Sequence, residues 1–300
     1  NAVKREDVKR LIAEMIRQDY AKGTIRNTIA AVRKMFNEAI ESGLVTSNPA
    51  SKMGRYMKAA RTNEKKGVAL TSTEIEQFLS AAAAVCPEYE LLFRAGFRAG
   101  LRRGELVALR WGDLHFGADE DDPNRYIYVQ HNYVRRLHTD TKSRKPRRVD
   151  MSRDLRRGLL KLRDERLVEA YAKGKSDILD DYVFPSPEGG ILDPDNLYHR
   201  YFRPVLTAAG IRKIRLHDLR HTFGSQLILK GASLLYVKEQ MGHHSIQVTA
   251  DTYGHLLPAA ETRYVDRLDE VPKKAEHGET QKNAAHESAS PAQVTNPLLR

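Results

Sequence analysis

The sequence is poor in cysteine and has no long apolar run. Its 300 residues include one cysteine, Cys86, so the chain can form neither an internal disulfide nor a thiolate metal cluster. Scarce cysteine is typical of a reducing cytosol, and we expect the protein to be cytoplasmic. No apolar run approaches the roughly 20 residues that cross a bilayer, and no secretory signal is recognisable. The sequence therefore predicts no membrane partner.

Acidic residues are also in deficit. The chain has 50 Lys and Arg against 39 Asp and Glu, which gives a net charge of +11 and a pI near 9.6. Residues 1–60 hold 12 basic and 6 acidic side chains, so more than half of the excess lies in the first fifth of the chain. A basic excess of this size favours a polyanionic partner such as nucleic acid.

Apolar spacing and composition divide the chain into predicted units. Residues 1–60 carry two amphipathic helical patterns and a shorter third one, which predict a short helical DNA-binding domain. The polar stretch 61–69 is a predicted linker, and residues 70–271 are a predicted second domain. Residues 272–300 are polar and poor in aromatics, which predicts a disordered tail.

The second unit is predicted to be mainly α with a small antiparallel β-sheet. The stretch RYIYVQHNYV (125–134) predicts a strand, RRVDM (147–151) predicts its partner, and the basic residues between them predict a hairpin loop. Thr71 and Glu74 have the spacing of a capping box, which predicts a helix start. Further helices are predicted at about 152–173, 195–209, 217–230, 233–241 and 257–268.

The stretch HDLRHTFGS (217–225) is a candidate for a site. On a helix, His217 shares a face with both Arg220 and His221. Either the two histidines hold a metal ion such as zinc, or His217 and Arg220 bind an anion together. An arginine beside a dication is repulsive, and Asp218 replaces the glutamate of the zinc motif H-E-x-x-H, so the anion is favoured. His221 is then expected to be structural, packing behind the site.

Four other stretches accompany it in the second unit. They are AGLRRGELVALRW (99–111), TKSRKPRR (141–148), MGHHSIQ (241–247) and TADTYGHL (249–256). In this order the five stretches resemble the catalytic domain of the tyrosine recombinases, specifically the phage-type integrases, over roughly residues 70–268. The helical part before it is similar to the family's core-binding domain, although three helices are evident where the family has about four, and the family's small arm-binding domain has no counterpart here.

The resemblance implies six catalytic residues, matched motif by motif: Arg102, Lys142, His217, Arg220, His243 and Tyr253. In the family, the tyrosine attacks phosphorus, a 3′-phosphotyrosine bond forms and a 5′-hydroxyl leaves, and a second strand's 5′-hydroxyl reverses the step. The resemblance implies that no metal and no nucleotide cofactor is needed. It also implies double-stranded DNA at a specific recombination site as the partner, a homotetramer on synapsed DNA, and accessory DNA-bending proteins.

The residue types suit this chemistry in their own right. Negative charge develops on the non-bridging oxygens in the transition state, and preorganised guanidiniums at Arg102 and Arg220 stabilise it. Glu105, one turn after Arg102, is placed to hold the arginine side chain. Tyrosine is a weak nucleophile at its free pKa of about 10, and nearby positive charge is expected to favour the phenolate of Tyr253. A lysine or histidine can protonate the leaving oxygen.

Two of these assignments have rivals. Lys145 competes with Lys142, because both lie in the same basic stretch. Tyr236 and Tyr264 compete with Tyr253, since a tyrosine on a terminal helix usually packs its ring on the core. Only the motif TADTYGHL distinguishes Tyr253 from them.

The expected function is site-specific DNA cleavage and rejoining in phage or genomic-island integration and excision. A resolving or inverting recombinase of the Xer type is a close alternative. A non-catalytic DNA-binding protein that keeps the fold is an alternative of another class, and the filling of all six active positions argues against it.

Overall fold

The computed structural model describes residues 3–62, 68–134, 137–140, 146–257 and 265, and of residues 137–140 the backbone alone. Outside these residues lie Lys142, Lys145, Tyr264, the predicted tail and nearly all of the predicted helix 257–268. Among the described residues, every helix is too short or too polar to span a bilayer. The domain boundaries given above stay a prediction.

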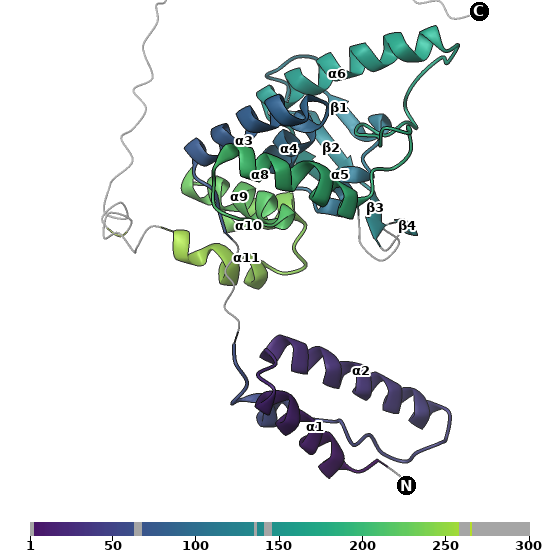
Figure 1. The fold of residues 1–300 in the computed structure, drawn as a ribbon, viewed down its shortest axis with the longest axis vertical. Helices are drawn as coiled ribbons and strands as arrows, with labels where there is room; N and C mark the ends of the chain where they lie inside the picture. The colour runs from purple at the N-terminus through teal and green to yellow at the C-terminus, as the bar shows by residue number, and fades with distance from the viewer. Residues whose placement is uncertain (1–2, 63–67, 135–136, 141–145, 258–264, 266–300) are drawn as a thin grey trace, which may run out of the picture. The chain divides into compact units, whose positions relative to one another are not determined.

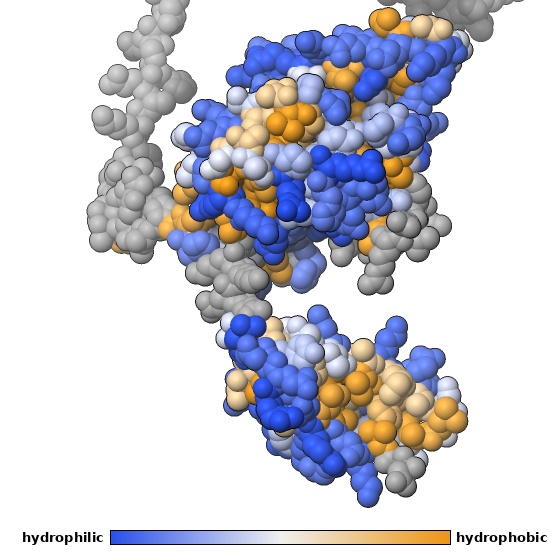
Figure 2. All heavy atoms as spheres, viewed as in Figure 1, coloured by the Kyte–Doolittle hydropathy of each residue, from blue (hydrophilic) through white to orange (hydrophobic). Residues whose placement is uncertain are grey.

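The N-terminal residues form a hydrophobic cluster of their own. Helices α1 (Arg5–Arg17) and α2 (Lys22–Glu41) confirm the two predicted amphipathic helices. The predicted shorter third helix forms only as a 3-10 helix, η1 (Gly54–Met57), after the left-handed backbone of Lys52. The apolar faces pack together, with Ile12, Ile25, Ile29 and Met53 fully buried. Apolar residues also gather on the visible surface of this part of the chain (Figure 2).

The second part begins at the predicted capping box. The backbone N–H of Glu74 donates to Thr71 Oγ1 (3.2 Å), and the N–H of Thr71 donates to Glu74 Oε2 (2.7 Å), which starts helix α3 (Ser72–Val85). Helix α4 (Pro87–Ala99) follows and packs on α3. Both helices point phenyl rings inward, and Phe78, Phe93 and Phe97 meet Phe202 from later in the chain to form an aromatic centre.

Helix α4 is covered on two sides by long helices (Figure 1). These are α6 (Arg153–Ala172) and α9 (Leu216–Leu229), both close to their predicted bounds, and both contact α4. The helix predicted at 195–209 forms as three consecutive pieces, α7 (Pro194–Asn196), the π-helical η4 (Leu197–Phe202) and α8 (Arg203–Ala209). Of these, α8 packs on α3.

The small sheet has three antiparallel strands. Their order is β1 (Leu114–Phe116), β2 (Arg125–Val129) and β5 (Arg147–Asp150). The buried Ile127 lies opposite Leu114 on one side and Val149 on the other, so the sheet turns one apolar face to the core. This confirms the predicted pairing of the two strands.

The prediction of one hairpin loop between the two strands is partly wrong, because part of that segment forms a strand. The strand expected at 125–134 breaks at Gln130, whose side chain donates to Asp113 Oδ1 (2.7 Å). The chain continues as β3 (His131–Val134), which pairs with β4 (Leu137–Asp140) in a second sheet. The basic composition of this segment predicted a loop. Antiparallel pairing uses only backbone groups, so β4 forms without a hydrophobic pattern.

The C-terminal end of the described chain carries two short helices. α10 (Leu234–Met241) matches its prediction, whereas α11 (Ile246–Tyr253) was not predicted. Four β-branched residues, Ile246, Val248, Thr249 and Thr252, give α11 weak helix propensity. Burial of Thr249 and Tyr253 supplies the packing that propensity does not.

Candidate active site

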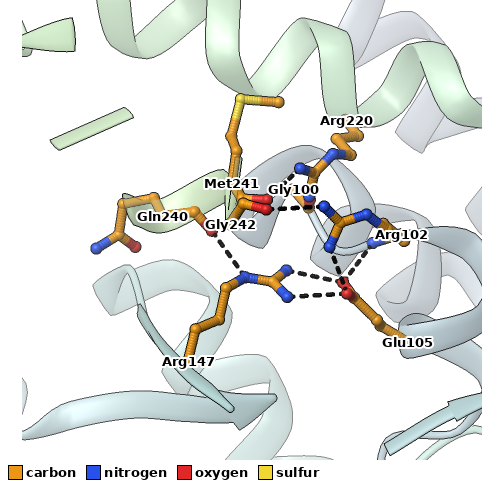
Figure 3. Close-up of polar contacts among 8 residues, drawn as sticks. All are labelled: Gly100, Arg102, Glu105, Arg147, Arg220, Gln240, Met241 and Gly242. Atoms are coloured by element: carbon orange, nitrogen blue, oxygen red, sulfur yellow. Dashed lines mark hydrogen bonds and ion pairs between the residues drawn. The ribbon is translucent and has the colours of Figure 1, made fainter. Parts of the chain in front are cut away.

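The C-terminal end of α10 gathers three arginines (Figure 3). The consecutive backbone carbonyls of residues 240–242 each accept a hydrogen bond from one guanidinium, in the order Arg147, Arg220 and Arg102. Arg147 Nε lies 3.3 Å from the first carbonyl oxygen, and Arg102 Nη2 lies 2.9 Å from the third. The last carbonyls of a helix have no partner inside it and carry partial negative charge, so they suit cations.

Gly242 makes this arrangement possible. Its backbone is left-handed (φ 60°, ψ 48°), which ends α10 and turns its own carbonyl away from the helix. A Cβ at this position would lie 2.6 Å from Arg147 Cδ, well inside van der Waals contact. Both the conformation and the space therefore require glycine.

Glu105 joins two of the arginines. Its carboxylate accepts two hydrogen bonds from Arg147 (2.8 and 2.7 Å) and one from Arg102 Nη1 (2.7 Å). Its Oε2 also accepts the backbone N–H of Arg102 (2.8 Å), the N-cap residue of helix α5 (Arg103–Val107). Burial alone would raise the pKa of Glu105, but the hydrogen bonds and charges of the two arginines outweigh it and lower the pKa to about 2. The carboxylate is therefore ionised at neutral pH, and the prediction that Glu105 holds Arg102 is confirmed.

Arg220 is the most buried of the three guanidiniums. Its side chain comes from α9, and its Nη1 donates to the carbonyl of Gly100 (2.5 Å). Burial, together with the charges of Arg102 and Arg147, lowers the pKa of Arg220 to about 9. The guanidinium still carries its charge at neutral pH.

Two histidines line the same hollow. A cavity of about 910 Å³ is bordered by Arg102, Arg147, Arg220, His217 and His243. Burial is the main cause that lowers the pKa of both histidines to about 4, assisted by the positive charge of Arg220. Both imidazoles are therefore neutral at pH 7. Arg148 and Lys238 also line the cavity, so its lining holds five cationic side chains against the carboxylates of Glu105 and Glu239, which makes it a site for an anion.

Tyr253 lies beside this cavity without lining it. The tyrosine is 2% exposed, its hydroxyl lies 3.1 Å from His221 Nδ1, and its ring packs on Gly224, where a Cβ would come within 2.7 Å of Tyr253 Cζ. Burial raises the pKa of Tyr253, and the charge of Arg220 opposes this only in part. The charge of Arg220 therefore favours the phenolate as expected, but desolvation of the phenolate outweighs it in this arrangement.

One residue of the site was missed from the sequence. His221 lies outside the cavity lining, as expected, and there it contacts the Tyr253 hydroxyl. Arg147 was not singled out from the basic stretch around it. A signal was available, because residues 147 and 149 lie on one face of a strand and Val149 is apolar, so Arg147 must point inward.

The structure also shows where the rival tyrosine and the two histidines of the metal alternative lie. The rival Tyr236 donates its hydroxyl to Asp150 (2.9 Å), away from the three arginines. The rings of His217 and His221 meet edge to face at 4.8 Å. In the part of the chain that the structure describes, no three His, Cys, Asp or Glu residues are grouped to hold a metal ion.

Known proteins are similar to this chain in sequence. The family described as "Phage integrase family" matches residues 69–259. A "Tyrosine recombinase XerC-like" protein of Caldanaerobacter subterraneus subsp. tengcongensis is 28% identical, with 90% of this chain and 71% of that protein covered. The "ICEBs1 integrase" of Bacillus subtilis is 26% identical, over 83% of this chain and 66% of the relative.

A solved structure shows the same fold. The Tn1549 transposon integrase in complex with a circular intermediate DNA superposes with a TM-score of 0.68 at 21% identity, covering 89% of this chain and 85% of that one. The predicted fold class, mainly α with a small antiparallel sheet, is confirmed.

Replacing Gly242 by alanine is expected to lower the free energy of unfolding by more than backbone strain alone would. A left-handed alanine costs about 1–2 kcal/mol, and the contact with Arg147 adds about 1–3 kcal/mol of overpacking. The matched control is Gly210→Ala, since Gly210 has a similar φ of 62° and no atom within 4 Å of its Cβ position. Chemical denaturation measures both variants. Equal losses of unfolding free energy in the two variants would show that the Arg147 side chain moves aside at no measurable cost.

Proposed function

This chain belongs to the phage integrase family, the tyrosine recombinases that cut and rejoin DNA, and we propose that it does so at a specific site through a 3′-phosphotyrosine intermediate. The proposed catalytic residues are Arg102, Lys142, His217, Arg220, His243 and Tyr253. The proposal rests mainly on the cavity in which the guanidiniums of Arg102 and Arg220 and two neutral histidines line one hollow that can receive a phosphate.

The arginines suit the non-bridging oxygens. Their contacts with backbone carbonyls and with Glu105 fix the guanidiniums before any substrate binds. Because they need no reorganisation during the reaction, they stabilise the negative charge that develops on the non-bridging oxygens in the pentacoordinate transition state. Arg102 and Arg220 supply this charge, and His217 and His243 supply hydrogen bonds to the same phosphate.

Tyr253 is the proposed nucleophile. Attack on phosphorus forms the Tyr253–phosphate bond and breaks the bond to the 5′-oxygen. The phenol releases its proton to solvent as it attacks, and the leaving 5′-oxygen takes a proton from the proposed acid, Lys142. The hydroxyl now contacts His221, a neutral imidazole whose pKa is lowered, mainly by burial. The proposed attack requires the hydroxyl to leave His221 and enter the cavity, where a phosphate and two arginines replace the apolar surroundings of its ring.

The proposed partner is double-stranded DNA, bound at two synapsed sites by four copies of the chain. Four copies are needed because two duplexes present four strands, and each strand is cut by one tyrosine. Accessory DNA-bending proteins are part of the proposal for a mobile element. Integration and excision are favoured by the similarity to the integrases of ICEBs1 and Tn1549, and Xer-type resolution is the second candidate, favoured by the XerC-like relative.

We expect Tyr253→Phe to abolish the covalent protein–DNA adduct. The substitution removes the nucleophilic oxygen and one hydrogen bond, so DNA binding should stay within about 1 kcal/mol of the unmodified protein. The assay uses a nicked suicide substrate, which traps the adduct. Tyr236→Phe is the matched control, since it also removes one bonded hydroxyl. An adduct formed by Tyr253→Phe, or lost in Tyr236→Phe, would overturn the assignment, and an unmodified protein that binds without reacting would support a non-catalytic binder.

We expect Lys142→Ala to cleave ordinary DNA poorly and to recover on DNA with a bridging 5′-phosphorothiolate. A placed acid is worth about 10²–10⁴ in rate, whereas a thiolate leaves without a proton because its pKa is far lower than that of an alcohol. Arg102→Ala should not recover, since its charge serves the non-bridging oxygens of both substrates. Recovery in Lys145→Ala instead would identify the other lysine as the acid. If neither recovers, His217 or His243 is the next candidate.

We expect cleavage to proceed in excess EDTA at a rate within about twofold of the untreated protein, because guanidiniums supply the positive charge. The suicide-substrate rate and DNA affinity are measured together. Loss of cleavage at unchanged affinity would restore the metal interpretation of His217 and His221.

A further inference from the structure

We propose that Arg147 is a positioning residue for the phosphate-binding arginine Arg102. Its guanidinium donates two hydrogen bonds to Glu105, and Glu105 in turn accepts hydrogen bonds from both the backbone and the side chain of Arg102. The inference rests on the proposed function, because it assigns Arg102 to the scissile phosphate. Arg147 itself acts through these contacts and does not touch the substrate.

Arg147 and Glu105 form a bidentate ion pair, in which each terminal nitrogen of the guanidinium donates to a different carboxylate oxygen. Nη1 donates to Oε1 at 2.8 Å and Nη2 donates to Oε2 at 2.7 Å, so the two planar groups face each other in register. Such a bidentate pair fixes orientation as well as distance. The Glu105 side chain is 6% exposed and that of Arg147 is 14% exposed, so water competes little for either group.

The other side of Arg147 is held by α10. Its Nε donates to the carbonyl of Gln240. The side chain of Gln240 then returns to β5, because its Oε1 accepts the backbone N–H of Asp150 (2.8 Å) and its Nε2 donates to the carboxylate of that residue (3.1 Å). Gln240 thereby ties the strand that carries Arg147 to the helix whose end receives all three arginines. The guanidinium is fixed from both directions.

Charge explains why two arginines are needed for one carboxylate. A buried carboxylate is costly unless hydrogen bonds and opposite charges compensate it. If Arg147 is removed, Arg102 becomes the sole guanidinium bound to Glu105 among the described residues. Both carboxylate oxygens then compete for it, which draws Arg102 away from the Gly242 carbonyl that now accepts its Nη2.

The contacts of Arg147 with described residues already engage three of its N–H groups, the Nε–H and one on each terminal nitrogen. Two of these three donate to Glu105, so both terminal nitrogens of the guanidinium are directed at the carboxylate (Figure 3). This orientation favours positioning over direct contact with the phosphate.

The test is a double-mutant cycle in the suicide-substrate assay, with single-turnover cleavage measured at saturating protein. Arg147→Met should slow cleavage by about 10- to 100-fold, the effect of a small misplacement of a catalytic group. Arg147→Lys should restore little of the cleavage rate lost in Arg147→Met, because an ammonium cannot form the bidentate contact with Glu105. Arg102→Ala combined with Arg147→Met should be no slower than Arg102→Ala alone, within the roughly twofold accuracy of additivity.

Arg125→Met is the matched control. Arg125 lies on the neighbouring strand β2 and also donates to two backbone carbonyls, those of Met151 (2.9 Å) and Asp122 (2.9 Å), but it does not contact Glu105. Its cleavage rate should match that of the unmodified protein. Thermal unfolding and DNA affinity are measured for every variant, and if Arg147→Met fails to fold, Arg147→Lys carries the same comparison.

A second substrate separates positioning from a general loss of structure. A methylphosphonate at the scissile position lacks the charge that Arg102 neutralises, so the deficits of Arg102→Ala and Arg147→Met should shrink together. Multiplicative losses in the double variant would mean that Arg147 contacts the phosphate itself, and an unchanged rate in Arg147→Met would mean that it positions nothing. Either result overturns the inference, whereas failure of the proposed function appears as no adduct from the unmodified protein.

Discussion

Three consecutive carbonyls at the end of one short helix determine where the positive charge of this site lies. Arg102, Arg147 and Arg220 come from a helix start, a strand and a long helix, and they meet because residues 240–242 each offer one acceptor. A hydrogen bond to a charged group is worth about 1.5–3 kcal/mol. Gly242 keeps these acceptors together, since its left-handed backbone ends the helix while its missing side chain leaves room for Arg147.

Like charges held this close repel each other, and the protein offsets that cost with one buried carboxylate. Glu105 contacts two of the three guanidiniums, and its lowered pKa shows that it stays ionised despite its burial. The site remains net positive, which raises its affinity for an anion and for a transition state that is more anionic still. The histidines contribute no charge at neutral pH, because burial keeps them deprotonated.

The nucleophile candidate is held apart from that charge. Tyr253 rests on Gly224 and His221 of α9, in surroundings that raise its pKa, while Arg220 reaches the cavity from the same helix. The position of α11 therefore governs whether the phenol meets the arginines. α11 has weak helix propensity of its own and is held in place by the burial of Thr249 and Tyr253.

The sequence alone was sufficient for the regular elements and for the motif. Apolar spacing and capping chemistry predicted α1, α2, α3, α6, α9 and α10, and strand composition predicted the pairing of β2 with β5, because these patterns are local. The spacing of His217 and Arg220 likewise predicted a shared face, and both residues line the cavity. Tertiary structure decided the rest. β4 formed through backbone pairing, α11 through burial, and the desolvation of Tyr253 overcame the nearby charge. The role of Arg147 depends on a carboxylate 42 residues earlier and a carbonyl 93 residues later, and no local pattern encodes contacts at that distance.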